Sequence, residues 1–366
     1  MPTKELVISA DSHVNVPHED WATRLPAKYK SRAPKVEKTP EGDVVVFEGK
    51  RTPLQGLAAM AGRDPRDFSD RIKETNARPG GWDPNKRMKD QDMDGVAAEV
   101  LYGGGPPGQS DDIPFRFELY RAYNDWLADF CKAQPKRLFG IGFVPIFEIE
   151  GAISELKRIK QLGHVGAVLP TTQNIKPYGD PYWDPLWKTA VDLGFPLHFH
   201  AREGITVRGE RLPYEGMPKT GAWLSIGAIT QFHLAAELLW SGLYERFPKL
   251  RLGHIEGNVG WIPYMLERCD QVFERHRFWT KAVITTKPSE QWRRNCFASF
   301  IVDHIGVQVR QWVGVDNFMW SSDYPHSDTS WPDSQKGIES MFKGVPKQDR
   351  EKILAKNAVK LYHLPY

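Results

Sequence analysis

The sequence is poor in cysteine. Its 366 residues contain three, Cys131, Cys269 and Cys296, and no two of them form a C-x-x-C pair. An odd, widely spaced set argues against a disulfide framework and against a thiolate zinc site, and it fits a reducing cytoplasm. The first residues, MPTKELVISADSH, lack the apolar core of a secretory signal, and no apolar run of 18 residues occurs. We therefore expect a cytoplasmic protein without a membrane partner.

Excess charge of either sign is also missing. The chain has 49 Lys and Arg against 46 Asp and Glu, and both signs are interspersed, so no basic stripe indicates a nucleic-acid partner. The sequence contains no G-x-S-x-G elbow, no phosphate-binding P-loop and no H-E-x-x-H zinc-protease motif. We therefore expect a small-molecule substrate and a reaction that uses neither a serine nucleophile nor a P-loop.

Strand-like apolar runs recur along the chain, with segments of helical periodicity between them. The eight runs are Leu6–Ala10, Ala97–Tyr102, Leu138–Pro145, Gly166–Leu169, Pro196–His200, Leu250–Ile255, Phe297–Val302 and Phe318–Ser321. The helical segments include Phe115–Cys131, Ile149–Leu162, Ala222–Tyr244 and Trp261–Phe278. Eight such alternating units predict an α/β fold, a (β/α)8 TIM-type barrel formed as one domain by residues 1–366.

Residues from about 34 to 81 interrupt this pattern. The segment is rich in charge, Pro and Gly, and VVVFEGKRT predicts a hairpin that turns at Glu48 and Gly49. We interpret it as an insertion after the first strand, at the mouth of the barrel, where it would form a lid or a subunit contact. A simple surface excursion fits the sequence equally well. The insertion and the 13 tryptophans favour a homo- or hetero-oligomer.

Histidines and carboxylates gather at the ends of four predicted strands. They are Asp11 and His13, His198 and His200, His254 and Glu256, and Asp323 with His326 just past the last strand. Residues i and i+2 of a strand face the same side, and the C-terminal strand ends of such a barrel converge on one mouth. A single histidine at a strand end is more often structural than functional. The combination instead offers the nitrogen and oxygen ligands that Zn²⁺, Mn²⁺ and Fe²⁺ prefer.

Several longer motifs resemble those of the amidohydrolase-related family, which includes the aminocarboxymuconate-semialdehyde-type decarboxylases. They are DSHVN near the N-terminus, GGWDPNKRMKDQDMDGV before the second strand, the histidine of FH at residues 199–200, GHIEGNVGWIPY, and WSSDYPH. The resemblance spans nearly the whole chain and implies a metal-dependent TIM barrel. It implies that His13, His200 and Asp323 are metal ligands and that His254 is the acid/base histidine.

The chain also departs from the family pattern. Many members carry H-x-H after the first strand, but here the second position is Asn15, and Asp11 is the residue that would replace it. His198 and Glu203 are additional donors, and with His326 they exceed the needs of one ion. Glu203 has an alternative role as a salt-bridge partner of Arg202. The surplus raises the hypothesis of two metal ions.

The leading hypothesis is a metal-dependent hydrolase or non-oxidative decarboxylase for a small carboxylated or amide substrate. His254 would be the general acid/base, oriented by Glu256 or Asp323, and one or two divalent ions would bind, zinc if one and iron or manganese if two. The alternative is a dinuclear monooxygenase component that needs O2 and an electron-transfer partner. A minor alternative is a structural subunit that pairs with an active homologue.

Overall fold

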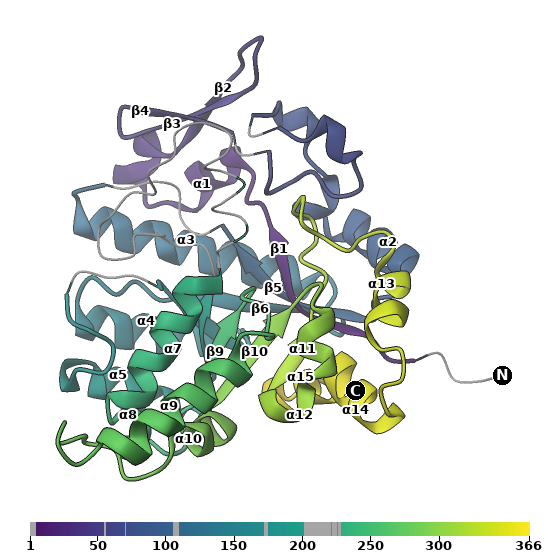
Figure 1. The fold of residues 1–366 in the computed structure, drawn as a ribbon. Helices are drawn as coiled ribbons and strands as arrows, with labels where there is room; N and C mark the ends of the chain where they lie inside the picture. Colours follow the sequence, from purple (N-terminus) through teal and green to yellow (C-terminus); the bar gives the residue numbers. More distant parts are fainter. Residues whose placement is uncertain are drawn as a thin grey trace.

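Eight parallel strands form the centre of the molecule (Figure 1). This computed structural model describes residues 5–54, 56–69, 71–104, 110–171, 175–200, 221, 225 and 228–366. The strands are β1 (Ile8–Val14), β5 (Ala98–Gly103), β6 (Leu138–Phe143), β7 (Gly166–Leu169), β8 (Leu197–His200), β9 (Leu252–Ile255), β10 (Cys296–Phe300) and β11 (Phe318–Trp320). They lie in the order of the sequence, as expected when each crossover leads to the adjacent strand. The predicted TIM-type barrel is confirmed.

Two backbone hydrogen bonds close the barrel between its first strand and the segment after its last. Asp323 N donates to Asp11 O over 3.0 Å, and His13 N donates to Tyr324 O over 2.6 Å. A third contact runs from Ser322 N to the Ser9 hydroxyl over 2.8 Å. We call this junction the seam. It joins residues 9–13 directly to residues 322–324.

Helices follow most of the strands and cover the barrel. They are α1 (His18–Arg24), α2 (Pro84–Asp94), α3 (Ile113–Lys132), α4 (Ile149–Gln161), α5 (Asp184–Asp192), α7 (Ala228–Trp240), α8 (Leu243–Arg246), α9 (Ile262–His276), α10 (Pro288–Asn295), α11 (His304–Gln308), α12 (Arg310–Val313), α13 (Ser334–Met341), α14 (Lys347–Glu351) and α15 (Asn357–Tyr362). Within the described part of the chain, none has the length and apolarity that crossing a membrane requires.

The single helix expected up to Tyr244 is broken. Helix α7 ends at Trp240 and α8 begins at Leu243, because Gly242 between them takes a left-handed conformation with φ of 76°. The backbone then turns, and α8 continues in a new direction. The apolar periodicity runs through both helices, which is why the pattern alone did not reveal the break.

A small antiparallel sheet forms the insertion. Its strands are β2 (Lys35–Glu37), β3 (Val44–Phe47) and β4 (Lys50–Pro53), paired in that order. Glu48 and Gly49 turn the β3–β4 hairpin with positive φ angles of 47° and 75°, a geometry that fits a two-residue hairpin loop. The hairpin and the insertion after the first strand are confirmed. Figure 1 shows this sheet at the end of the barrel toward which β1 runs.

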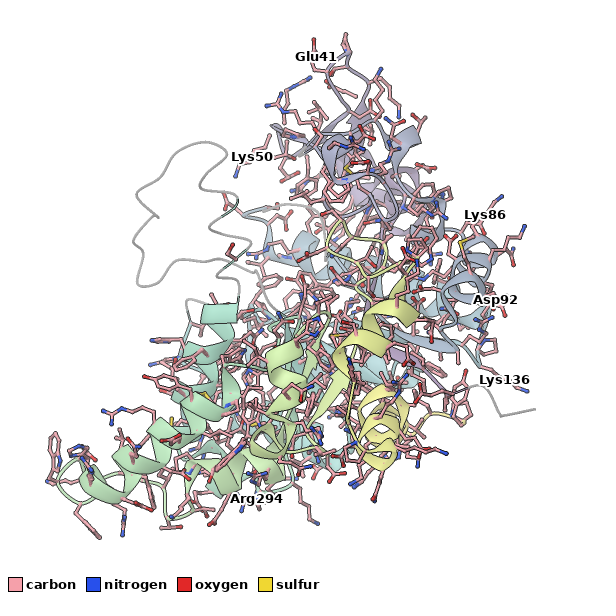
Figure 2. All side chains as sticks on the ribbon, turned by 45° about the vertical axis from the view of Figure 1, so that its right-hand side comes forward. Glu41, Lys50, Lys86, Asp92, Lys136 and Arg294 are labelled. Carbon is pink, nitrogen blue, oxygen red and sulfur yellow. The ribbon has the colours of Figure 1, made fainter. Side chains whose placement is uncertain are left out.

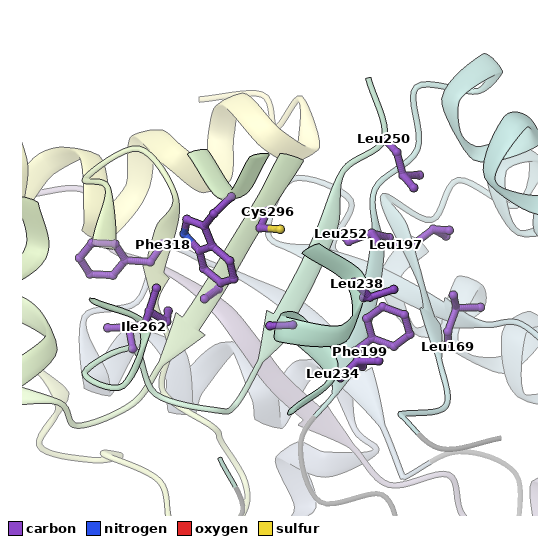
Figure 3. Packing of buried hydrophobic residues seen from close by; sticks show 14 of the residues in the cluster. Leu169, Leu197, Phe199, Leu234, Leu238, Leu250, Leu252, Ile262, Cys296 and Phe318 are labelled. Carbon is purple, nitrogen blue, oxygen red and sulfur yellow. The ribbon is translucent and has the colours of Figure 1, made fainter. Parts of the chain in front are cut away.

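The apolar core occupies the layer between strands and helices. Leu197, Leu252 and Phe318, at the starts of β8, β9 and β11, are fully buried in one cluster. Figure 3 shows Phe199 of β8 next to Leu234 and Leu238 of α7. Burial on both faces explains why these strands are short, nearly continuous apolar runs in the sequence.

Arg87 of α2 ties the seam to the outer helices. Its fully buried guanidinium pairs with Glu99 of β5 over 2.5 Å, and it donates to the carbonyl oxygens of His13 over 2.6 Å and Tyr324 over 3.4 Å. The last two oxygens belong to opposite sides of the seam. A buried charge of this kind is tolerated because every direction of the fork has an acceptor.

We expect Arg87→Met to lower the free energy of unfolding by about 3–5 kcal/mol, because the change leaves the buried Glu99 carboxylate without its cationic partner and removes one donor from each of two buried carbonyl oxygens. Urea denaturation followed by circular dichroism measures the effect. Arg66→Met is the control, since Arg66 is exposed and its one partner among the described residues is its neighbour Asp64. Equal stability of the two variants would show that Arg87 does not support the seam.

Candidate metal centre

Four donor atoms from three strand ends converge at the C-terminal mouth of the barrel. His13 Nε2 of β1 lies 3.0 Å from His200 Nε2 of β8. Glu256 Oε2, just after β9, lies 3.1 Å from His200 Nε2, and Asp11 Oδ1 of β1 lies 3.5 Å from it. Glu256 Oε2 and Asp11 Oδ1 lie 4.0 and 3.9 Å from His13 Nε2. The two imidazoles therefore face each other between two carboxylates.

These spacings fit one divalent cation. With ligand bonds of about 2.1 Å, neighbouring donors lie roughly 3.0 Å apart around an octahedral ion and about 3.4 Å apart around a tetrahedral one. Among the described residues, neither carboxylate oxygen of the fully buried Asp11 takes part in a hydrogen bond. A buried carboxylate left in this state is costly unless a cation compensates it.

Burial also prepares His13 as a ligand. It lowers the pKa of His13 to about 4, helped by the nearby His326 and opposed by Asp323 and Asp11. The ring is therefore neutral at physiological pH. A metal ion binds only the neutral imidazole, so the protein does not have to release a proton from His13 before an ion enters.

Asp323 approaches the other side of the His13 ring. Its Oδ1 lies 3.0 Å from His13 Nδ1 and 2.9 Å from Nδ1 of His326, whose ring stacks on His13 at 3.8 Å. Burial alone raises the pKa of Asp323, but the two imidazoles outweigh it and hold the pKa far below its usual value. Donor atoms of His13, Glu256, Asp323 and His326 all lie within 4.8 Å of one another. Asp323 and His326 thus join the same centre.

Two carboxylates of the centre have a strained backbone. Glu256 and Asp323 both take the left-handed conformation, with a φ of 58° each. Such a conformation costs an L residue of order 1–3 kcal/mol and persists where the surroundings fix it, often at functional sites. It also means that the alternation of a strand does not extend to these two positions. Glu256 reaches His200 because the chain turns after Ile255.

The structure does not bring His198 to the centre. Its Nδ1 lies 3.0 Å from Ala167 O and its Nε2 lies 3.1 Å from the hydroxyl of Tyr362 on α15. His198 and His200 do face the same side, since both rings contact Tyr102. Positions i and i+2 of a strand, however, lie about 6.6 Å apart along its axis. His198 therefore sits deeper in the barrel, and both of its nitrogens are engaged there.

Glu203 and Asn15 are the remaining positions that the sequence singled out. Glu203 lies outside the described residues. Asn15 donates from Nδ2 to Ala58 O over 3.1 Å, so its side chain holds the insertion against the mouth. Asp11, in contrast, lies beside His13 and His200.

His254 of β9 is a fully buried, neutral imidazole two residues before Glu256. Burial lowers its pKa to about 3, and its ring stacks on Trp292 of α10 at 5.4 Å. Its Nδ1 lies 2.9 Å from Gln231 Oε1, and its Nε2 has no hydrogen-bond partner among the described residues. We expected Glu256 or Asp323 to orient this ring. That expectation was wrong, because Gln231 of α7 holds Nδ1 instead.

Gln231 fixes the tautomer of His254. Its own amide nitrogen donates to Phe199 O over 2.9 Å, so its oxygen must be the group that faces Nδ1. Nδ1 then carries the proton and Nε2 carries the lone pair. Sequence reasoning missed Gln231. The available signal was a single glutamine within the apolar helix AITQFHLAAELLW.

Comparisons with known proteins agree on the family to which this chain is similar. An amidohydrolase family model matches residues 10–364. The gamma-resorcylate decarboxylase of a Polaromonas species is 27% identical over 303 residues, covering 76% of this chain and 87% of that protein. The 2-amino-3-carboxymuconate-6-semialdehyde decarboxylase of Dictyostelium discoideum is 26% identical over 296 residues, covering 77% of each.

Solved structures share the fold. An amidohydrolase from Mycobacterium avium subsp. paratuberculosis has a TM-score of 0.76 at 18% identity, and the match covers 98% of both chains. A dihydroxybenzoic acid decarboxylase from Polaromonas, solved with manganese and the inhibitor 2-nitroresorcinol, has a TM-score of 0.65 at 21% identity, covering 99% of this chain and 97% of that one.

We expect His200→Gln to weaken the binding of manganese by more than the roughly 10–100-fold that substitutions outside the ligand set cost. His198→Gln, on the same strand and the same face, should keep the wild-type metal content, because its nitrogens bond elsewhere. Elemental analysis after dialysis against limiting manganese measures both. Loss of metal in both variants, or in His198→Gln alone, would contradict the ligand set.

Proposed function

The chain belongs to the amidohydrolase family, and from this premise we propose that it is a metal-dependent decarboxylase that removes CO2 from an aromatic carboxylic acid without oxidation. The observation that carries the proposal is the cluster of histidine and carboxylate donors. Two residues before Glu256, the neutral His254 has an Nε2 without a hydrogen-bond partner among the described residues. A cation site and a proton carrier are the two parts that this reaction needs.

The relatives support the substrate class. The curated relatives reported above are named as decarboxylases of gamma-resorcylate and of an aminocarboxymuconate semialdehyde, and the structural neighbour from Polaromonas as a dihydroxybenzoic acid decarboxylase. Most of these names describe a carboxylate on a hydroxylated ring. We propose a substrate of the same chemistry for this chain.

Proton movement follows from the state of His254. In the reaction the bond between a ring carbon and the carboxyl carbon breaks, its electron pair stays on the ring carbon, that carbon gains a proton, and CO2 leaves. His254 starts neutral, so Nε2 first accepts the proton of a ring hydroxyl of the substrate and then gives it to the ring carbon. Water returns a proton to the ring oxygen, which restores the hydroxyl. Gln231 keeps Nδ1 protonated throughout, so only Nε2 takes part in the transfer.

The remaining residues of the centre provide binding. A divalent ion held by Asp11, His13, His200 and Glu256 would supply the positive charge that holds the oxygens of the substrate. Asp323 contacts Nδ1 of both His13 and His326, so it orients the His13 ring and balances the charge of the centre. Together they align the carboxylate of the substrate and keep the imidazoles in place.

The other hypotheses receive less support. Hydrolysis would use the same donors, but both curated relatives reported above are named as decarboxylases. The dinuclear oxygenase hypothesis depended on surplus donors; of these, His198 is engaged elsewhere, His326 pairs with Asp323, and Glu203 lies outside the described residues. The converged donor set argues against an inactive partner subunit.

We expect release of CO2 from 2,6-dihydroxybenzoate or 5-carboxyvanillate by the manganese-loaded protein under anaerobic conditions. In D2O, one deuterium should replace the carboxyl group of each product molecule. His254→Asn should lower kcat by about 10²–10⁴-fold with little change in KM, because the proton carrier is lost while substrate binding remains. Turnover that requires O2, or an active His254→Asn variant, would contradict the proposed reaction.

We expect Gln231→Leu to lower kcat by about 10–100-fold at nearly constant KM, because His254 loses the acceptor that fixes its tautomer. Gln231→Glu should retain more activity, since an oxygen still faces Nδ1. Gln291→Leu is the matched control, because Gln291 is equally buried but donates to Thr286 O. If Gln231→Leu and Gln291→Leu behave alike in steady-state kinetics, the positioning role is excluded.

A further inference from the structure

A cavity lies at the opposite end of the barrel from the metal centre. It measures about 300 Å³ and opens where β8, β9, β10 and β11 begin, with α15 beside it. Figure 2 shows Arg294, which adjoins the lining residue Arg293, at the far end of the molecule from Glu41 of the insertion. In barrels of this class the catalytic groups lie at the other end, so this cavity is separate from the proposed active site.

The charged residues that line this cavity are mostly cations. Lys249, Arg251, Arg293 and Lys360 all contribute, and none of them pairs with a carboxylate within the described part of the chain. The one carboxylate in the lining, Asp316, lies 2.9 Å from the ammonium of Lys352, which is not part of the lining. Four positive charges therefore surround the cavity, and its single negative charge is already neutralised.

Arg251 is the most informative of the four. Its Nε is buried and forms no hydrogen bond with any described residue, and its guanidinium lies 5.9 Å from the centre of the Phe297 ring. Burial lowers the pKa of Arg251. A partly buried guanidinium is normally paired with an anion, because removing its charge from water is costly. Here the described residues provide no such anion.

We propose that this cavity binds a small molecule through a phosphate group. Guanidinium and ammonium donors match the oxygens of a phosphate, and several cations of both kinds suit its double negative charge better than a single carboxylate. The volume limits the ligand to the size of a small metabolite. The proposal does not depend on the decarboxylase activity, because no lining residue belongs to the metal centre.

Thermal unfolding tests the site directly on the full, metal-loaded chain. Inorganic phosphate and glycerol 3-phosphate are titrated against potassium chloride of equal ionic strength, with citrate as the non-phosphate anion. We expect saturable stabilisation by phosphate, with the melting temperature rising by about 3 °C at a concentration 100 times Kd. Tighter binding of the ester would identify an organic phosphate as the ligand, and tighter binding of the free ion would identify inorganic phosphate. Equal stabilisation by citrate would overturn the phosphate assignment.

Variants locate the effect in the cavity. Arg251→Met should abolish the stabilisation by phosphate, while the melting temperature without phosphate stays the same or rises, because an uncompensated buried charge is gone. Lys249→Met with Lys360→Met changes only exposed side chains, so it folds, and it should weaken binding at least 10-fold.

The matched control is Lys86→Met with Lys136→Met, two exposed lysines outside the lining that Figure 2 labels. This control makes the same change in net charge and should bind phosphate like the wild type. Phosphate stabilisation that survives in the Lys249/Lys360 variant, that is lost equally in the control, or that is absent from the wild type would overturn the proposal.

Discussion

The closure of the barrel at the seam is the constraint on which the centre depends. The two backbone hydrogen bonds that join β1 to the segment after β11 are made by Asp11, His13, Asp323 and Tyr324, and three of these residues also carry side chains of the metal centre. The backbone contacts that hold the sheet together therefore also set the distances between the donors. Arg87 strengthens this arrangement from outside, because one guanidinium bonds carbonyl oxygens on both sides of the seam. A small shift of β1 relative to residues 322–324 would move the donor atoms relative to one another. The centre would then lose the alignment that binding an ion and a substrate requires.

Burial has two consequences at the mouth of the barrel. It keeps His13 and His254 neutral, so that the first can bind a cation and the second can accept a proton. It also removes the carboxylate of Asp11 from water, which is unfavourable in the protein alone and becomes favourable when a cation binds. The left-handed conformations of Glu256 and Asp323 add a further cost. The centre is thus built at the expense of stability, which the apolar layer around the strands offsets.

The same physical argument applies to the two ends of the barrel with opposite signs of charge. The carboxylate of Asp11 at the mouth, which accepts no hydrogen bond from a described residue, indicates a cation. The guanidinium of Arg251 at the other end, which pairs with no described carboxylate, indicates an anion. Between them the interior holds polar groups that satisfy one another, such as His198 with Ala167 and Tyr362. Paired and unpaired buried groups can therefore be distinguished by asking where each polar atom finds a partner.

The sequence by itself determined the barrel, the hairpin of the insertion, and the faces of the strands, because alternation and apolar periodicity are local properties of the chain. It placed Asp11, His13 and His200 at strand ends, where the structure brings them together. It did not separate His200 from His198, since alternation gives the face of a strand and says nothing of depth in the barrel. It also missed Gln231 and Arg87, which reach His254 and the seam from helices. Such contacts are decided only by tertiary packing, because they join residues that no local pattern relates.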